Sequence, residues 1–299
     1  MRRGAAAQGA APVWAIVVHY GASASTRRTL DSLRAGTVRP DQFLVVDNQG
    51  DWEDEPGDVK VVRPGANLGF AGGAAEGARV ALAGGAAWLW FVNNDAVVAA
   101  RCLEALADFA AGSPDAGMLS PLIAYGDGGL WYAGGVVDPV SFRVSHLTAS
   151  PGTRLAFETG YITGCAMFVR AAALEAAGLP DARLFMYLED VDLSLRVRRL
   201  GWRLMVVPTA LVTHDVERRN GRRVFSATGV YLVTRNRLVL AGRRGALARA
   251  VPPALVWGLR QVVKAARQGT LRQVAAAAAC GLCDGLRGVT GPPYAGRRR

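Results

Sequence analysis

Residues 87–95 read Ala-Trp-Leu-Trp-Phe-Val-Asn-Asn-Asp, an apolar run that ends abruptly in two amides and a carboxylate. A run without polar alternation predicts a strand that is buried on both faces, as in the middle of a parallel sheet. In such sheets, ligands bind beyond the carboxyl ends of the strands. This stretch therefore predicts both the class of fold and the edge of the sheet where a functional site lies.

The flanking sequence repeats the alternation of apolar strands and helical patterns. We expect strands at 13–19, 43–46, 59–62, 87–92, 118–123, 161–169, 203–207 and 210–214, and helices at 25–35, 70–82, 99–110, 171–177 and 190–200. Residues 124–158 are rich in Gly, Ser, Asp and Pro and predict a loop or an irregular hairpin. The pattern predicts an α/β fold with a mainly parallel sheet and helices on both faces.

The last part of the chain differs in charge. The net charge of the chain is +11, but residues 1–214 sum to −3 and residues 215–299 to +14. Amphipathic helices with Arg on their polar sides are expected at 224–241, 253–267 and 271–286. Basic helices of this kind suit an anionic membrane surface or nucleic acid, and the alternative is a solvated tail wrapped on the core. We expect a flexible leader (1–12), a catalytic domain (13–220) and a basic helical extension (221–299).

Targeting signals and cysteines bear on location. The apolar part of the N-terminus, 13–18, is too short for a signal peptide, and no stretch reaches the roughly 18 apolar residues of a membrane span. Cys102, Cys165, Cys280 and Cys283 are too irregularly spaced for a disulfide framework. A cytoplasmic protein is expected, with the basic extension placing it at the inner leaflet.

Acidic residues follow two of the predicted strands. Asp47 comes after the strand at 43–46 and is positioned to accept hydrogen bonds from a ribose hydroxyl or a base, or else to form a turn with Asn48 and Gly50. Asp95 ends the run quoted above. Its carboxylate suits Mg²⁺ or Mn²⁺, and the alternative is a cap for the next helix.

A third acidic group starts a predicted helix. Glu189, Asp190 and Asp192 crowd three carboxylates into four positions, where they repel one another unless a cation, a proton or a donor compensates. Such a cluster indicates a general base or a metal site, or else an acidic helix start favoured by the helix dipole. His214 ends a predicted strand and is either a metal ligand or a structural histidine.

A Gly-rich segment, 67–77, lies between the first two acidic positions. Its backbone N–H groups could approach a phosphate, or its glycines could permit tight packing of a helix on the sheet. The segment does not match G-x-G-x-x-G and has no P-loop lysine, so neither of those nucleotide sites is indicated.

Six motifs in sequence order resemble the family 2 glycosyltransferases, and within them the bacterial rhamnosyltransferase-like branch. They are Val-Val-Asp-Asn (45–48), Asn-Leu-Gly-Phe-Ala-Gly-Gly (67–73), Asn-Asn-Asp (93–95), Thr-Gly-Cys-Ala-Met-Phe-Val-Arg (163–170), Tyr-Leu-Glu-Asp-Val-Asp-Leu-Ser-Leu-Arg (187–196) and Tyr-Leu-Val-Thr-Arg-Asn-Arg (231–237). The chain departs from the family pattern at His19, Ala75 and Asn93, the last of which replaces the first Asp of the metal-binding D-x-D.

The resemblance implies a GT-A fold and an inverting, metal-dependent transfer from a dTDP- or UDP-linked sugar, such as rhamnose, to a hydroxyl of a saccharide or lipid-linked glycan. It implies Asp190 as general base, and Asp95 and His214 as ligands of Mg²⁺ or Mn²⁺. It implies a sugar or acceptor pocket of Thr163, Gly164, Cys165 and Glu189. The implied donor-binding residues are His19, Tyr20, Asp47, Asn67, Gly69, Phe70, Gly73, Asn94 and Asp95.

Other enzymes and a binding module remain as alternatives. A galactofuranosyl- or other hexosyltransferase would share the same motifs. A sugar nucleotidyltransferase would favour a Gly-rich loop with a cation after the first strand, whereas residues 19–23 read His-Tyr-Gly-Ala-Ser. A nucleic-acid-binding module leaves the acidic positions unexplained, and the basic extension lacks interleaved aromatic residues, so no nucleic-acid partner is expected.

Overall fold

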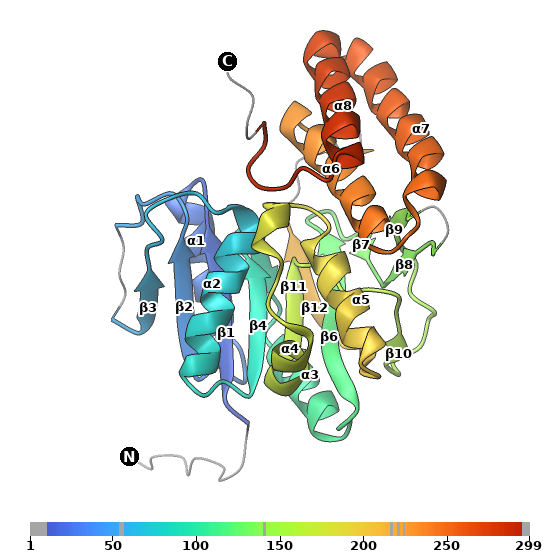
Figure 1. The fold of residues 1–299 in the computed structure, drawn as a ribbon. Coiled ribbons are helices and arrows are strands. Elements are labelled where there is room, and N and C mark those ends of the chain that lie inside the picture. The colour runs from blue at the N-terminus through green and yellow to red at the C-terminus, as the bar shows by residue number, and fades with distance from the viewer. Residues whose placement is uncertain are drawn as a thin grey trace, which may run out of the picture.

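The computed structural model describes residues 11–53, 57–139, 142–215, 218–219, 222–223 and 225–294. Its main sheet has the strand order β10-β12-β6-β11-β4-β1-β2-β3, with β5 paired to β12 and β7 to β6 (Figure 1). The strands are β1 (Val13–His19), β2 (Gln42–Asp47), β3 (Val59–Val62), β4 (Trp88–Asn93), β5 (Ala96–Val98), β6 (Ala116–Tyr125), β7 (Leu130–Tyr132), β8 (Gly135–Val137), β9 (Val144–His146), β10 (Phe157–Glu158), β11 (Ala166–Arg170), β12 (Arg203–His214), β13 (Arg218–Arg219) and β14 (Arg222–Arg223).

Helices connect the strands and extend the C-terminal part. They are α1 (Ser23–Arg34), α2 (Gly69–Ala83), α3 (Cys102–Ala111), α4 (Ala171–Ala177), the 3₁₀ turn η1 (Ala182–Leu184), α5 (Glu189–Arg199), α6 (Ala227–Arg243), α7 (Leu247–Ala266) and α8 (Leu271–Leu286). None of the helices that the structure describes combines the length and the apolar character needed to cross a bilayer.

The predicted parallel sheet is confirmed. β3, β2, β1 and β4 are mutually parallel, as are β6 and β12, and β11 is inserted antiparallel between β4 and β6. Two apolar clusters cover the two faces of the sheet. One includes Ile16 and packs against α2, α4 and α5, and the other includes Val17 and packs against α1 and α3. Because adjacent residues of a strand point to opposite faces, both clusters draw on the same strands.

Several predicted boundaries were wrong. The strand expected at 161–169 begins only at Ala166, because residues 161–165 form a loop at the end of the sheet. The helix expected at 99–110 begins at Cys102, since residues 96–98 pair with β12 instead. The strands expected at 203–207 and 210–214 are a single strand with an irregularity after Val207. The helix expected to start at Pro253 starts at Leu247 and accommodates two prolines in its second turn.

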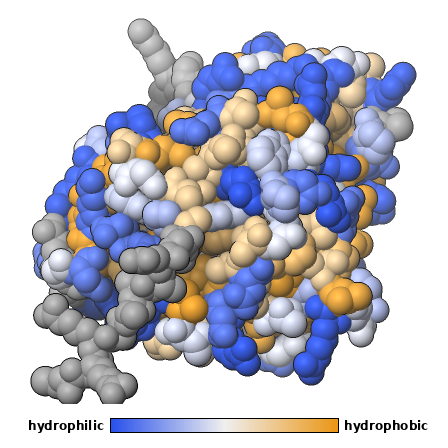
Figure 2. Space-filling view, turned by 90° about the horizontal axis from the view of Figure 1, so that it is seen from below, coloured by the Kyte–Doolittle hydropathy of each residue, from blue (hydrophilic) through white to orange (hydrophobic). Residues whose placement is uncertain are grey.

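The helices α6, α7 and α8 lie together above the carboxyl ends of the parallel strands (Figure 1). We expected Arg on the polar side of the first of these helices, but Arg235 and Arg237 of α6 are buried. The reason is that α6 is sandwiched between α8 and the chain around η1. At the opposite end of the molecule, near the amino ends of the strands, apolar and hydrophilic residues are interspersed on the surface (Figure 2).

Candidate active site

A cavity of about 690 Å³ opens where the carboxyl ends of β4 and β12 meet α6 and α7. Its walls bring together eight of the residues expected from the sequence. These are Phe70, Asp95, Thr163, Gly164, Cys165, Glu189, Asp190 and His214. The polar residues gather beside the sheet, while Phe225, Val233 and Trp257 provide an apolar wall from the C-terminal part. Asp95 and Asp190 are far apart in the sequence but line the same cavity. This is expected if a ligand binds beyond the carboxyl ends of the parallel strands.

Asp95 and His214 are brought together by the pairing of β5 with the end of β12. The Nε2 atom of His214 lies 3.0 Å from Oδ1 of Asp95, and the side-chain Nδ2 atom of Asn93 lies 3.3 Å from the same Nε2. Burial lowers the pKa of His214, but the charges and hydrogen bonds of Cys165 and Asp95 outweigh it and raise the pKa to about 10. The buried Nδ1 of this ring has no hydrogen-bond partner.

The Asp95 carboxylate is an oxygen ligand of the kind that suits Mn²⁺ or Mg²⁺, and His214 can join it as a ligand only as a neutral imidazole, after its proton is lost. The two side chains lie close enough together to hold one cation between them. A second group, formed by His19, Asp47 and Asp51, presents ligand atoms that all lie within 4.8 Å of one another. There the Asp47 carboxylate already accepts three backbone hydrogen bonds.

Asp190 lies in the first turn of α5 and faces the loop at 163–165. Its Oδ2 accepts a hydrogen bond from the Gly164 N–H at 2.9 Å, and its Oδ1 accepts one from the Val191 N–H at 2.8 Å. These two donors fix the direction of the carboxylate at the cavity wall. A Cβ at Gly164 would lie 3.0 Å from the Phe70 ring, so this wall is closely packed.

Glu189 precedes Asp190 but has a different environment. It is 6% exposed, and its Oε2 has no hydrogen-bond partner. Burial and the neighbouring Asp190 charge raise the pKa of Glu189 well above its usual value. A carboxyl group with a raised pKa keeps its proton, so Glu189 can donate a hydrogen bond into the cavity while Asp190 accepts one.

The chain that leads into α5 has an unusual backbone. Phe185, Tyr187 and Leu188 adopt positive φ angles of 65°, 70° and 68°. This conformation costs energy for residues other than glycine and persists only where the surroundings impose it. The strained segment ends directly at Glu189, so its conformation sets where the two carboxyl groups point.

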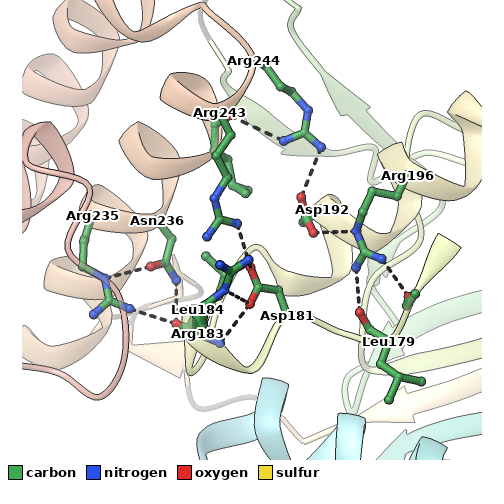
Figure 3. Close-up of polar contacts among 12 residues, drawn as sticks. Leu179, Asp181, Arg183, Leu184, Asp192, Arg196, Arg235, Asn236, Arg243 and Arg244 are labelled. Carbon is green, nitrogen blue, oxygen red and sulfur yellow. Dashed lines mark hydrogen bonds and ion pairs between the residues drawn. The ribbon is translucent and has the colours of Figure 1, made fainter.

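Helix α6 holds this segment, as Figure 3 shows. The side-chain nitrogen of Asn236 donates to the carbonyl oxygens of Leu184, Met186 and Tyr187 at 3.0, 3.0 and 2.8 Å. Arg235 donates to the Leu184 carbonyl at 3.0 Å. Both residues belong to the motif at 231–237, for whose residues no role was predicted. The sequence feature that could have indicated a role for them is the Arg-Asn-Arg run inside a largely apolar helix.

The expected base-binding residue Asp47 lies at the same edge of the sheet but outside the cavity wall. Its carboxylate is buried and accepts hydrogen bonds from the N–H groups of Gln49, Gly50 and Trp52 at 3.2, 2.7 and 3.1 Å. Arg63 lies 3.6 Å away. These contacts match the turn that was the alternative interpretation, and a contact with a nucleotide base stays a prediction.

The remaining donor-side residues surround the ends of β1 and β4. His19 is buried and lies 2.7 Å from the Thr26 hydroxyl and 3.2 Å from Asp51. Tyr20 is 58% exposed. Asn94 donates to the Tyr20 carbonyl at 2.9 Å. This group adjoins Asp95 through Asn94.

The Gly-rich segment is packed so closely that there is no room for a Cβ at Gly69 or at Gly73. Asn67 accepts a hydrogen bond from the Gly69 N–H at 2.8 Å. A Cβ at Gly69, where φ is +69°, would lie 2.1 Å from the Phe185 carbonyl oxygen, and one at Gly73 would lie 2.7 Å from Val18. The close-packing interpretation is therefore supported. The contact with Phe185 also links this loop to the strained segment before Asp190.

Comparison with known proteins identifies the family of this chain. The family model described as glycosyltransferase like family 2 matches residues 10–228. An N-acetylglucosaminyl-diphospho-decaprenol L-rhamnosyltransferase of Mycobacterium tuberculosis is 32% identical over 239 residues, which are 69% of this chain and 77% of the relative. Galactofuranosyltransferase GlfT1 of the same species is 32% identical over 200 residues, which are 63% of this chain and 65% of the relative.

Solved structures share the fold at low sequence identity. GalNAc-T7, crystallised with UDP, GalNAc and Mn²⁺, superposes with a TM-score of 0.59 at 19% identity over 70% of this chain and 44% of that one. Residues 1–349 of S. aureus TarS superpose with a TM-score of 0.51 at 16% identity over 80% of this chain and 70% of that one. The GT-A fold is thereby confirmed. With the family model covering most of its length, this chain belongs to glycosyltransferase family 2.

Proposed function

We propose that this glycosyltransferase moves a deoxyhexose such as rhamnose, with inversion, from a nucleotide-diphosphate sugar to a hydroxyl of a lipid-linked glycan. The observation that carries the proposal is the placement of Asp190 and of the Asp95–His214 pair on the walls of one cavity. The relative that carries rhamnosyltransferase in its name is 32% identical over most of both chains. Galactofuranose is the second candidate sugar, because relatives named for its transfer match almost as well.

In the proposed reaction, Asp190 removes the proton of the acceptor hydroxyl, which attacks the anomeric carbon opposite the leaving diphosphate. The N–H groups of Gly164 and Val191 hold the carboxylate in place for this step. A single displacement inverts the anomeric configuration. Asp95 and His214 would hold a Mg²⁺ or Mn²⁺ ion, which when bound supplies positive charge next to the diphosphate.

A protonated Glu189 can donate a hydrogen bond to a sugar oxygen beside the base. The apolar wall from α6 and α7 and the loop at 163–165 would exclude water from the reacting atoms. Excluding water matters because it would otherwise compete with the acceptor as nucleophile.

An anionic membrane is the proposed location of the acceptor. Leu255, Val256, Leu259 and Val263 of α7 are between 49% and 64% exposed, and their spacing places them on one side of the helix. Exposed basic residues border this apolar stripe, namely Arg249, Arg260, Lys264 and Arg267. An apolar face edged by Lys and Arg is the pattern of a helix that lies in the membrane interface.

A donor panel tests the proposal. Purified protein with Mn²⁺ or Mg²⁺ is offered dTDP-rhamnose, UDP-galactofuranose, UDP-glucose and UDP-N-acetylglucosamine with a diphospholipid-linked acceptor, and the product's anomeric configuration is read by NMR. We expect transfer from dTDP-rhamnose with inversion. Transfer from UDP-galactofuranose alone would favour the second sugar, a retained configuration would contradict the mechanism, and transfer that persists in chelator would contradict the metal requirement.

A further inference from the structure

Arg235 and Arg237 of α6 are both buried, but they differ in their hydrogen bonds. Arg235 is 0% exposed and donates to Asn236, to the Gly291 carbonyl and to the Leu184 carbonyl at 2.9, 2.7 and 3.0 Å. Arg237 is 4% exposed and faces the cavity. Its buried Nε has no hydrogen-bond partner, and no acidic residue of the described chain pairs with its guanidinium.

Leaving a guanidinium buried without an acceptor is costly. Burial and the positive charge of Arg143 lower the pKa of Arg237 to about 10, which still leaves it protonated at neutral pH. The Trp257 ring, 5.4 Å from the guanidinium carbon, supplies a cation–π contact but no hydrogen-bond acceptor. Among the described residues, therefore, none supplies an acceptor to the Nε–H of Arg237 on the wall of this cavity.

The surroundings indicate what would compensate this charge. The guanidinium presents several N–H donors in one plane, an arrangement that matches the oxygens of a phosphate. It lies on the wall that Phe225, Val233 and Trp257 make apolar, whereas Asp95 and Asp190 line the part beside the sheet. An anion bound at Arg237 would therefore gain a charge-assisted hydrogen bond.

We propose that Arg237 binds a phosphate group of a substrate and thereby makes α6 part of the substrate site. The proposal rests on the proposed function, because that function supplies two phosphate-bearing substrates. One is the nucleotide-diphosphate donor and the other is an acceptor carried on a lipid diphosphate. Both present the same chemistry to the guanidinium, and the apolar wall would accommodate the first part of a lipid chain as well as a nucleotide's ring.

The test compares Arg237→Met, which keeps the apolar stem beside Trp257, with Arg237→Lys, which keeps the charge but loses the planar set of donors. Arg199→Met is the matched control, because Arg199 is exposed in the last turn of α5 and α5's first turn, not its last, faces the cavity. Calorimetry with Mn²⁺ measures the Kd of UDP, dTDP and farnesyl diphosphate, with uridine, thymidine and farnesol as probes that lack phosphate.

In Arg237→Met we expect the Kd of at least one diphosphate probe to rise about 10-fold to 100-fold, as for a lost charged hydrogen bond, with a smaller rise in Arg237→Lys. A rise for UDP and dTDP assigns the donor diphosphate, and a rise for farnesyl diphosphate assigns the acceptor. The Kd values of uridine and thymidine should not change. Unchanged Kd values for every diphosphate probe would overturn the proposal.

Stability provides an independent readout. Because Arg237 is uncompensated, Arg237→Met should leave the Tm of the ligand-free protein unchanged or raised, whereas removing a structural arginine would lower it. A Tm several degrees below that of Arg199→Met would also overturn the proposal. If the wild type transfers no sugar in the donor panel, the proposed function fails, yet a difference in diphosphate binding between wild type and Arg237→Met would still support the anion site.

Discussion

Asp190 and Glu189 are adjacent in the chain, but only Asp190 has its carboxylate oriented by backbone donors on both oxygens. If Asp190 is the general base, Asp190→Asn should lower kcat by about 100-fold or more while donor affinity stays within error. Glu189→Gln is the matched variant, because an amide can still donate the hydrogen bond of a protonated carboxyl group, and it should retain far more turnover. Steady-state kinetics with a donor titration would measure both. Equal losses in the two variants would remove Asp190 from its role.

The raised pKa of Glu189 has a consequence for stability. An unfolded glutamate loses its proton near pH 4.3, whereas the folded protein keeps it to a higher pH. Between these two pKa values the folded state binds more protons, so the free energy of unfolding falls as pH rises, and above the folded pKa the loss is complete. In Glu189→Gln the side chain at position 189 does not titrate, so the variant lacks this pH-dependent loss of stability. We expect its unfolding free energy relative to wild type to increase from about pH 4.3 upward, as urea unfolding at several pH values would measure. Parallel curves would contradict the assignment.

The element that controls these two residues is α6. Asn236 donates to the carbonyl groups of Leu184, Met186 and Tyr187, so Asn236→Ala would leave buried acceptors unsatisfied and cost about 1–3 kcal/mol. It should also let residues 185–188 relax and lower kcat with little change in the KM for donor. Hydrogen exchange of this segment, measured beside the kinetics, separates local release from global instability.

Thr228→Ala is the control for this prediction, since Thr228 lies in the first turn of α6, about two turns before Asn236. Exchange in residues 185–188 that is equally slow in Asn236→Ala and in wild type would show that other contacts hold the backbone. The ion pairs between Arg243 and Asp181 and between Arg244 and Asp192 are the next candidates (Figure 3).

Element by element, the sequence predicted what depends on local pattern. The strand at 13–19 and the helix at 271–286 have the predicted bounds, because an unbroken apolar run and a helical repeat carry their own signal. The strand β5 was missed, because three residues become a strand only through pairing with β12. The burial of Arg235 could not be predicted either, because it too depends on distant parts of the chain. From sequence alone, an Arg-rich helix is expected to be exposed.

At the scale of the molecule, the sequence predicted the edge of the sheet but not the direction of each side chain. Asp95, Asp190 and His214 converge because the ends of neighbouring strands and the start of α5 meet there. Asp47 ends a strand at that edge too, yet its carboxylate turns into its own loop. The wall that contains Arg237 comes from the packing of α6 and α7 on this edge, which no local pattern encodes.

The exposed stripe of α7 gives a prediction for the whole molecule. If it lies in an anionic membrane interface, Leu259→Glu should reduce co-sedimentation with vesicles of phosphatidylglycerol, since it places a repelled charge where an apolar contact was. Leu155→Glu is the control, because Leu155 is 77% exposed but lies in the loop between β9 and β10 and not on α7. Wild type should bind anionic vesicles more than neutral ones, and added salt should weaken that preference by screening the basic border. Equal binding to both kinds of vesicle, or equal losses in the two variants, would contradict a role for this helix.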